Sequence, residues 1–244
     1  MKIAALSDIH GNLAALDAVL DDARNETVDL IVNLGDILSG ALYPAQTADR
    51  LMALGLPTIK GNHERQLLAG DPSRMGASDR FAYRALRDDQ LAWLRDLPAT
   101  LRPVEDVLLV HGTPSSDLDY FLETVTASGC RVATRAEVES RAGDAQATLV
   151  LCGHTHLQRS LKLEDGRLIV NPGSVGLPAY EDEHPFAHRM EAGSAHARYA
   201  IVTKHASGWD VRFKAVEYDW NEAARVAASN NRPEWARALL TGYC

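Results

Sequence analysis

The chain has 244 residues, 46% of them apolar, and a formal net charge of −8 at pH 7. This length can bury a sizeable core, and the acidic balance disfavours a surface built to bind nucleic acid polymers. The three cysteines form no CxxC pair, no apolar run could span a bilayer, and the first strand begins without a leader pattern, so we expect a cytoplasmic protein without membrane contact.

The first sixty residues alternate between strand and helix patterns. Asn12 suits an N-cap, and the apolar residues after it recur at spacings of three and four, which indicates an amphipathic helix. Gly55 suits the C-terminal cap of the next helix. The predicted elements are a strand at 2–7, a helix after Asn12, a strand at 29–34, a helix at 46–54 and a strand at 56–59. This alternation predicts parallel neighbouring strands and an α/β layered fold.

Later elements follow a helical insertion, which we expect at residues 64–100. Beyond it we predict strands at 104–110 and 148–152, a helix near 134–141, and hairpins at 159–170 and 198–218. Residues 178–196 are polar and are expected to form a long surface loop, either a substrate lid or a solvated loop. Residues 221–241 are predicted to be helical. Because no linker is visible, we expect one domain over 1–244.

Five of the predicted strands are followed by residues that can bind metal ions. The segments are Asp8-Ile9-His10, Gly35-Asp36, Gly61-Asn62-His63-Glu64, His111-Gly112 and Gly153-His154-Thr155-His156. The carboxyl ends of strands in an open α/β sheet border the ligand crevice, so we expect these side chains to meet. Mixed imidazole and carboxylate ligands suit Mn, Fe, Co, Ni or Zn. So many ligands favour two ions sharing a carboxylate, an arrangement that serves phosphoryl transfer.

These motifs, in this order, resemble those of the calcineurin-like metallophosphoesterase superfamily, in particular its small bacterial phosphoesterase and phosphodiesterase members. The segment Asn171-Pro172-Gly173-Ser174 also resembles one found in the bacterial relatives. The resemblance implies a four-layer fold of the α/β (α+β) class, in which a two-sheet β-sandwich is flanked by helices. It also implies two divalent metal ions, with Mn expected first and Fe, Zn, Ni or Co as alternatives.

The resemblance further implies a role for each residue of the site. The expected metal ligands are Asp8, His10 and His156 on one ion, Asn62, His111 and His154 on the other, and Asp36 as the bridge. His63 is expected to bind a phosphate oxygen and to protonate the leaving group, while a metal-bridging hydroxide attacks phosphorus. His63 and Asp36 are therefore the expected catalytic residues.

The chain departs from part of the family pattern at Ser39-Gly40-Ala41, where serine/threonine phosphatases and dinucleoside tetraphosphate hydrolases carry Asp-Arg-Gly. We therefore expect His63 to lack the usual aspartate partner and one phosphate-binding arginine to be missing. Arg65, Arg84 and Arg189 are candidates to replace that arginine. Both subfamilies are disfavoured by this departure.

The function expected from these observations is hydrolysis of small phosphodiesters or phosphomonoesters. The alternatives are a metal-binding scaffold for protein partners, a dinucleoside polyphosphate hydrolase and a protein phosphatase. We expect a small phosphate ester as the partner, and a monomer or small homo-oligomer as the assembly. Trp235, Leu239 and Leu240 are expected to pack on their own core rather than on a partner subunit.

Overall fold

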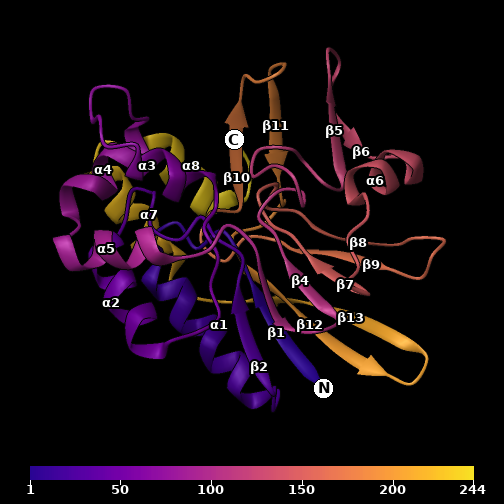
Figure 1. Cartoon of the computed structure of the whole chain (residues 1–244). Coiled ribbons are helices and arrows are strands. Elements are labelled where there is room, and N and C mark those ends of the chain that lie inside the picture. The colour runs from indigo at the N-terminus through magenta and orange to yellow at the C-terminus, as the bar shows by residue number, and fades with distance from the viewer.

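The computed structural model describes all residues, 1–244, and contains two main β-sheets (Figure 1). The first has four strands in the order β13-β12-β1-β2: β13 (Gly208–Val216), β12 (Ala197–His205), β1 (Lys2–Leu6) and β2 (Leu30–Asn33). The second has five strands in the order β3-β4-β7-β9-β8: β3 (Leu101–Val104), β4 (Val107–Leu109), β7 (Leu149–Leu151), β9 (Leu168–Pro172) and β8 (Gln158–Lys162). β1 and β2 run parallel, as do β4, β7 and β9.

The two sheets pack face to face, and β1 shows how the sequence produces this. Its side chains alternate between two separate cores, as the period of two along a strand requires. Ile3 and Ala5 face the core between the sheets, which also holds Leu109 and Leu151 from the second sheet. Ala4 and Leu6 face a second core under the helices. Burial on both faces explains why this strand is an unbroken apolar run.

Helices cover the outer face of each sheet, which makes four layers. The core outside the four-stranded sheet includes residues of α1 (Leu13–Asn25), α2 (Pro44–Leu54), α3 (Asn62–Leu68), α4 (Ala77–Ala85) and α5 (Asp88–Asp96). α6 (Arg135–Ala142) packs on the five-stranded sheet through Val138 and Ala142. The expected four-layer architecture is confirmed. None of the helices combines the length and apolar character needed to cross a bilayer.

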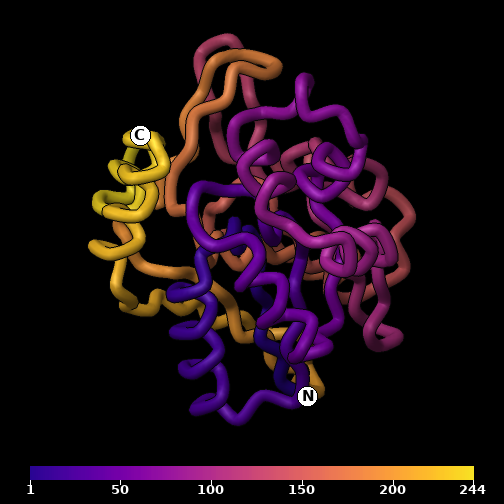
Figure 2. Tube along the Cα trace, turned by 90° about the vertical axis from the view of Figure 1, so that its left-hand side faces the viewer, coloured from indigo at the N-terminus to yellow at the C-terminus, as the bar shows by residue number.

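The C-terminal helices α7 (Trp220–Ser229) and α8 (Pro233–Thr241) form a separate core with two loop segments. Trp235 and Leu239 are buried there against Ala41 and Leu177, whereas Leu240 is exposed. Figure 2 shows these helices beside the hairpin segment at residues 179–191. The prediction that Trp235 and Leu239 pack within their own chain is therefore confirmed, while the one for Leu240 is wrong.

Two caps predicted from the sequence are confirmed. Asn12 accepts a hydrogen bond from the Ala15 N–H at 3.2 Å, and Gly55 ends α2 in the left-handed conformation with φ of 60°. The strand predicted at 56–59 is wrong, because only Thr58 forms a bridge to Asn33. The strand predicted at 104–110 is instead the hairpin of β3 and β4, because Glu105 and Asp106 form its turn.

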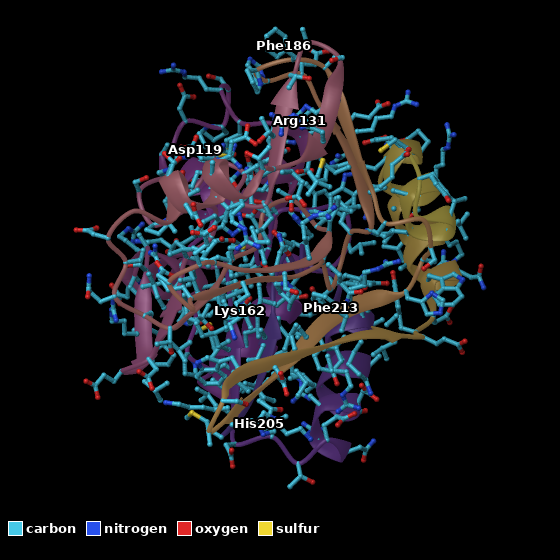
Figure 3. The ribbon with its side chains drawn as sticks, turned by 90° about the vertical axis from the view of Figure 1, so that its right-hand side faces the viewer. Asp119, Arg131, Lys162, Phe186, His205 and Phe213 are labelled. Atoms are coloured by element: carbon cyan, nitrogen blue, oxygen red, sulfur yellow. The ribbon has the colours of Figure 1, made fainter.

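The prediction of a loop over 178–196 is also wrong, because this segment folds into the antiparallel strands β10 (Ala179–Asp182) and β11 (His188–Glu191). A second hairpin, β5 (Glu123–Thr126) with β6 (Gly129–Val132), was not predicted. The two hairpins lie side by side at the same end of the molecule, where Phe186 and Arg131 mark them (Figure 3). The strands of both hairpins have exposed faces and are therefore polar. They lack the apolar pattern by which a buried strand is predicted.

Candidate metal centre

The structure brings the predicted ligands together at the carboxyl ends of the strands. Asp8 and His10 follow β1, Asp36 follows β2, His111 follows β4, His154 and His156 follow β7, and Asn62 opens α3. The ligand atoms of Asp8, His10 and His156 lie within 4.8 Å of one another, as do those of Asp36, His111 and His154. The Asn62 Oδ1 atom lies 3.0 Å from the His111 Nε2 atom. The first cluster has the members of the first predicted group, and the second joins Asp36, the predicted bridge, to His111 and His154.

The backbone at these positions is strained. Seven residues other than glycine have positive φ, and five of them are predicted ligands: Asp8, His10, Asp36, His154 and His156, with φ between 51° and 70°. Left-handed backbone is unfavourable for residues with a Cβ and persists only where the surroundings enforce it. Here hydrogen bonds between the loops do so, for example from the Asp8 N–H to the Gly35 carbonyl at 3.0 Å and from the His10 N–H to the Asp36 carbonyl at 3.0 Å.

Each ligand histidine is fixed by a backbone carbonyl that accepts from one ring nitrogen. The Nδ1 atoms of His10, His111 and His156 lie 2.7, 2.8 and 2.6 Å from the carbonyl oxygens of Ser39, Leu34 and Leu177. His154 has the opposite orientation, with its Nε2 atom 3.1 Å from the Leu118 carbonyl. A carbonyl partner places the proton on the bonded nitrogen, which leaves the other nitrogen as a lone-pair donor toward a metal ion.

These ring orientations make the nitrogen lone pairs of His10 and His156 face one another. With both Nδ1 atoms protonated, the Nε2 atoms of His10 and His156 lie 3.1 Å apart without a proton between them. The Asp8 carboxylate is 3.6 Å from the same His156 atom. Such an arrangement of acceptors is unfavourable on its own and suits a cation at their common centre. The donor set therefore fits two divalent ions bound by imidazole, carboxylate and amide groups.

The buried charges of the site shift several pKa values. Burial lowers the pKa of His10 to about 4 and that of His154 to about 3, and it raises the pKa of Asp8 to about 7. Burial also lowers the pKa of His111, but the charge and hydrogen bond of Asp36, together with the charge of Asp8, offset it and raise the pKa to about 10. Protonated His111 then contacts the Asp36 carboxylate at 3.0 Å. A metal ion bound by His111 must displace this proton, which makes metal affinity depend on pH.

His63 belongs to neither cluster and has an aspartate partner. Its side chain is 28% exposed, and its Nδ1 atom lies 2.7 Å from the Asp79 Oδ1 atom. Burial lowers the pKa of His63, but the carboxylates of Asp36 and Asp79 more than offset this and raise it to about 9. Position 39 carries serine, so the usual aspartate is absent, and Asp79 supplies a carboxylate to His63 from a different element. Asp79 is the third residue of α4, and acidic residues are common in the first turn of a helix because they stabilise it. The sequence therefore did not single out Asp79 as a partner of His63.

Glu64 has a structural role that was not predicted from the sequence. Its buried carboxylate accepts hydrogen bonds from the N–H groups of Asp36 and Ile37, both at 2.8 Å, and from Gly61 at 2.9 Å. One side chain thus joins the loop after β2 to the start of α3. The loop that carries Asp36 is held in place by this contact.

A cavity of about 1380 Å³ borders both clusters. Its lining includes His10, Asp36, His63, Tyr180, Arg232 and Trp235. Of the arginines proposed from the sequence, Arg189 lines the cavity but pairs with Glu181 at 2.8 Å, whereas Arg65 and Arg84 do not line it.

The β10–β11 hairpin forms one wall of the cavity and is tied to the metal centre. Tyr180 donates a hydrogen bond to the His154 carbonyl at 3.0 Å, and its hydroxyl lies 2.7 Å from that of Tyr120. The Tyr120 hydroxyl in turn lies 2.8 Å from the His188 Nε2 atom on β11. The segment predicted as a loop is therefore a structured wall, anchored in part by Tyr120 and Tyr180, which sequence reasoning did not select.

Comparisons with known proteins agree with this geometry. A family model described as the calcineurin-like phosphoesterase superfamily domain matches residues 1–192. The uncharacterized protein MJ0912 of Methanocaldococcus jannaschii is 25% identical over 257 residues, covering 96% of this chain and 94% of that protein. The crystal structure of a metallophosphoesterase from Sphaerobacter thermophilus superposes with a TM-score of 0.72 at 26% identity, covering 98% of each chain. A putative diadenosine tetraphosphatase shares the fold, with a TM-score of 0.53 at 17% identity, covering 88% of this chain and 94% of that one.

Proposed function

Because the chain belongs to the calcineurin-like phosphoesterase superfamily, we propose that it is a dinuclear metal-dependent hydrolase of small phosphodiesters or phosphomonoesters. The observation that carries this proposal is the pair of buried clusters in which lone pairs of Asp and His side chains converge beside a cavity. We also propose that residues 1–244 form one domain, because α7 and α8 share a core with the segments around Ala41 and Leu177.

The proposed ligands follow the two clusters. One ion would be held by Asp8, His10 and His156, the other by Asn62, His111 and His154, with Asp36 between them. Asp36 suits the bridging role because its carboxylate contacts His111 while its carbonyl accepts from the His10 N–H. When bound, two divalent ions polarise the phosphoryl oxygens and activate water for attack. Mn²⁺ is the first ion to test, followed by Fe, Zn, Ni and Co.

His63 is proposed to deliver the proton that the leaving oxygen needs. Its ring lies 5.5 Å from that of His10, centroid to centroid, and borders the cavity. Asp79 accepts the Nδ1–H, which orients the ring and leaves Nε2–H as the donor toward a leaving oxygen. The departure at Ser39-Gly40-Ala41 therefore does not deprive His63 of a carboxylate.

The size of the cavity supports organic phosphate esters as the substrate class. Pockets for small ligands are commonly about 300–1,000 Å³, and this cavity is about 1380 Å³. A phosphoryl group at the clusters would leave space for a substantial alcohol portion. The His63–Asp79 contact also removes one of the two objections to a dinucleoside polyphosphate as the substrate, namely the missing carboxylate partner of His63.

The test is metal content measured alongside turnover of an aryl phosphomonoester and an aryl phosphodiester. The protein would be purified without chelator and assayed with and without Mn²⁺, and again after treatment with EDTA. We expect about two ions per chain and metal-dependent turnover of at least one ester. A dinucleoside polyphosphate and a phosphopeptide would be assayed in the same way. Two bound ions without turnover of any of these four substrates would overturn the proposal in favour of a metal-binding scaffold.

A further inference from the structure

One arginine at the cavity has a polar group that no other residue binds. Arg232 is the N-cap of α8, and its side chain is 16% exposed. Its Nη2 atom donates to the Ser78 hydroxyl at 3.1 Å, and its Nε atom pairs with Glu234. Its Nη1 atom is buried, lacks any hydrogen-bond partner, and belongs to a residue that lines the cavity.

A buried N–H group of a cation without a partner is costly, and a bound anion would satisfy it. The guanidinium is planar and matches the oxygens of a phosphate group. Three other arginines line the cavity. Arg189 pairs with Glu181, and Arg141 donates to the carbonyls of Phe121 and Glu123 and to Thr124, while Arg237 is exposed to solvent. Arg232 is therefore the arginine of the cavity that is mostly buried and keeps a donor without a partner.

Two neighbours connect Arg232 to the proposed catalytic residues. Its guanidinium lies 5.3 Å from the centre of the Trp235 ring, and that ring lies 5.9 Å from the ring of His10. Its partner Ser78 precedes Asp79, which binds His63. Arg232 thus contacts Trp235, whose ring packs beside His10, and Ser78, which is next in sequence to the partner of His63.

The packing of Trp235 explains how α8 reaches this position. A Cβ at position 40 would lie 2.2 Å from the His10 carbonyl oxygen and 2.9 Å from the Trp235 ring. Only glycine at position 40 therefore allows the indole to pack against the loop. The segment Ser39-Gly40-Ala41, which carries no arginine of its own, is the surface against which Trp235 packs, and Arg232 lies over the Trp235 ring.

We propose that Arg232 binds an oxygen of the substrate's phosphoryl group, so that α8 supplies the arginine absent from residues 39–41. This inference rests on the proposed function. It makes Arg232 a substrate-binding residue whose loss weakens phosphate binding and leaves the metal ligands intact.

The test uses inorganic phosphate as the probe. Binding to the Mn²⁺-loaded protein would be measured by calorimetry for the wild type and Arg232→Ala, alongside KM for the aryl ester, metal content and thermal unfolding. We expect Arg232→Ala to weaken phosphate binding and raise KM by about 10- to 100-fold, the range for a hydrogen bond to a charged group, with both ions retained. Arg225→Ala is the matched control, because Arg225 lies outside the cavity lining and pairs with Glu222 on the surface.

Arg232→Lys keeps the charge and much of the packing but loses the planar donor pair, and we expect it to weaken phosphate binding by about 3- to 10-fold. This variant decides the matter if Arg232→Ala unfolds or loses metal. Phosphate affinity and KM in the Arg232 variants equal to those of Arg225→Ala would overturn the inference. A wild-type protein without metal-dependent turnover would instead refute the proposed function, so the two failures are distinguishable.

Discussion

The Oδ1 atom of Asp79 lies 2.7 Å from the Nδ1 atom of His63, and the two residues come from different helices, α4 and α3. This contact fixes the orientation of the one histidine at the centre that is not part of a ligand cluster. It also supplies from another element the carboxylate that residues 39–41 lack.

The first prediction concerns His63. Replacing it with alanine should lower kcat by about 10²- to 10⁴-fold, the range for a positioned proton donor, while both metal ions remain bound. Steady-state kinetics and metal analysis on the same preparation test this. His205→Ala is a suitable control, because that histidine is 49% exposed at the end of β12 and lies outside the cavity lining. Full activity in His63→Ala would exclude the assigned role.

The second prediction concerns Asp79. Asp79→Asn keeps the shape of the side chain but weakens the hold on His63, so kcat should fall by about 10- to 100-fold with KM and metal content unchanged. Because Asp79 acts through His63, the double variant His63→Ala/Asp79→Asn should be no slower than His63→Ala alone. Additive losses in this cycle would show that Asp79 acts independently of His63.

The third prediction concerns Asp36. Asp36→Ala should lose the paired arrangement of ions and nearly all activity, because the carboxylate between the two clusters is gone. Metal analysis and turnover with excess Mn²⁺ test this. Asp210→Asn, at a side chain that is 82% exposed, controls for the loss of one negative charge. Full activity with one tightly bound ion would contradict the two-metal scheme.

The fourth prediction tests the loop geometry without altering any ligand. A Cβ at position 61 would lie 2.1 Å from the Asp36 Oδ1 atom, so Gly61→Ala should displace that carboxylate and reduce metal content and activity together. Gly76→Ala is the matched control, because a Cβ there meets only the Asp79 Oδ2 atom at 3.8 Å, an ordinary contact. If both variants retained full metal content, the tight contact between Gly61 and Asp36 would be disproved.

The fifth prediction concerns stability in acid, away from the metal centre. Hydrogen bonds from Lys214 and Arg212 lower the pKa of Glu26 from 4.5 to about 2. A lowered pKa means that Glu26 contributes stability fully above its unfolded value of 4.5 and loses the contribution as the pH falls toward 2.

Glu26→Gln should therefore lower the melting temperature at neutral pH, and the difference from the wild type should shrink as the pH falls through this window. Thermal unfolding of chelator-treated protein as a function of pH measures the effect. Added salt should reduce it, because the ion pairs reach the surface. A difference that does not change with pH would show that the charge of Glu26 is not responsible.

The two side-chain clusters could be predicted from the sequence because all their members lie a few residues past a strand end. Asp8 and His154 are reached by counting a residue or two past an apolar run, and the topology of parallel strands brings such ends together. The prediction needed no knowledge of how the helices pack. The Asn12 cap was predictable for the same reason, since its signal lies in adjacent residues, whereas the two-sheet architecture was implied by the family resemblance.

Asp79 and Arg232 could not be found in this way, because only the packing of α4 and α8 brings them to the centre. On their own elements they are a first-turn acidic residue and an N-cap. The hairpin at 179–191 escaped prediction for a related reason. Of its strand residues only Ala179, His188 and Met190 are buried, too few to produce a clear alternating pattern.

The left-handed backbone at the ligand positions has a consequence for how such a chain can change over generations. Holding a residue with a Cβ in this conformation costs about 1–2 kcal/mol, whereas glycine adopts it readily. Glycine at positions 8, 10, 36, 154 or 156 would thus relieve strain in the backbone while removing a proposed metal ligand. A descendant released from selection for metal binding would drift toward glycine or asparagine at these five positions. That drift would be a signature of lost function, readable in the sequence even where the fold had not changed.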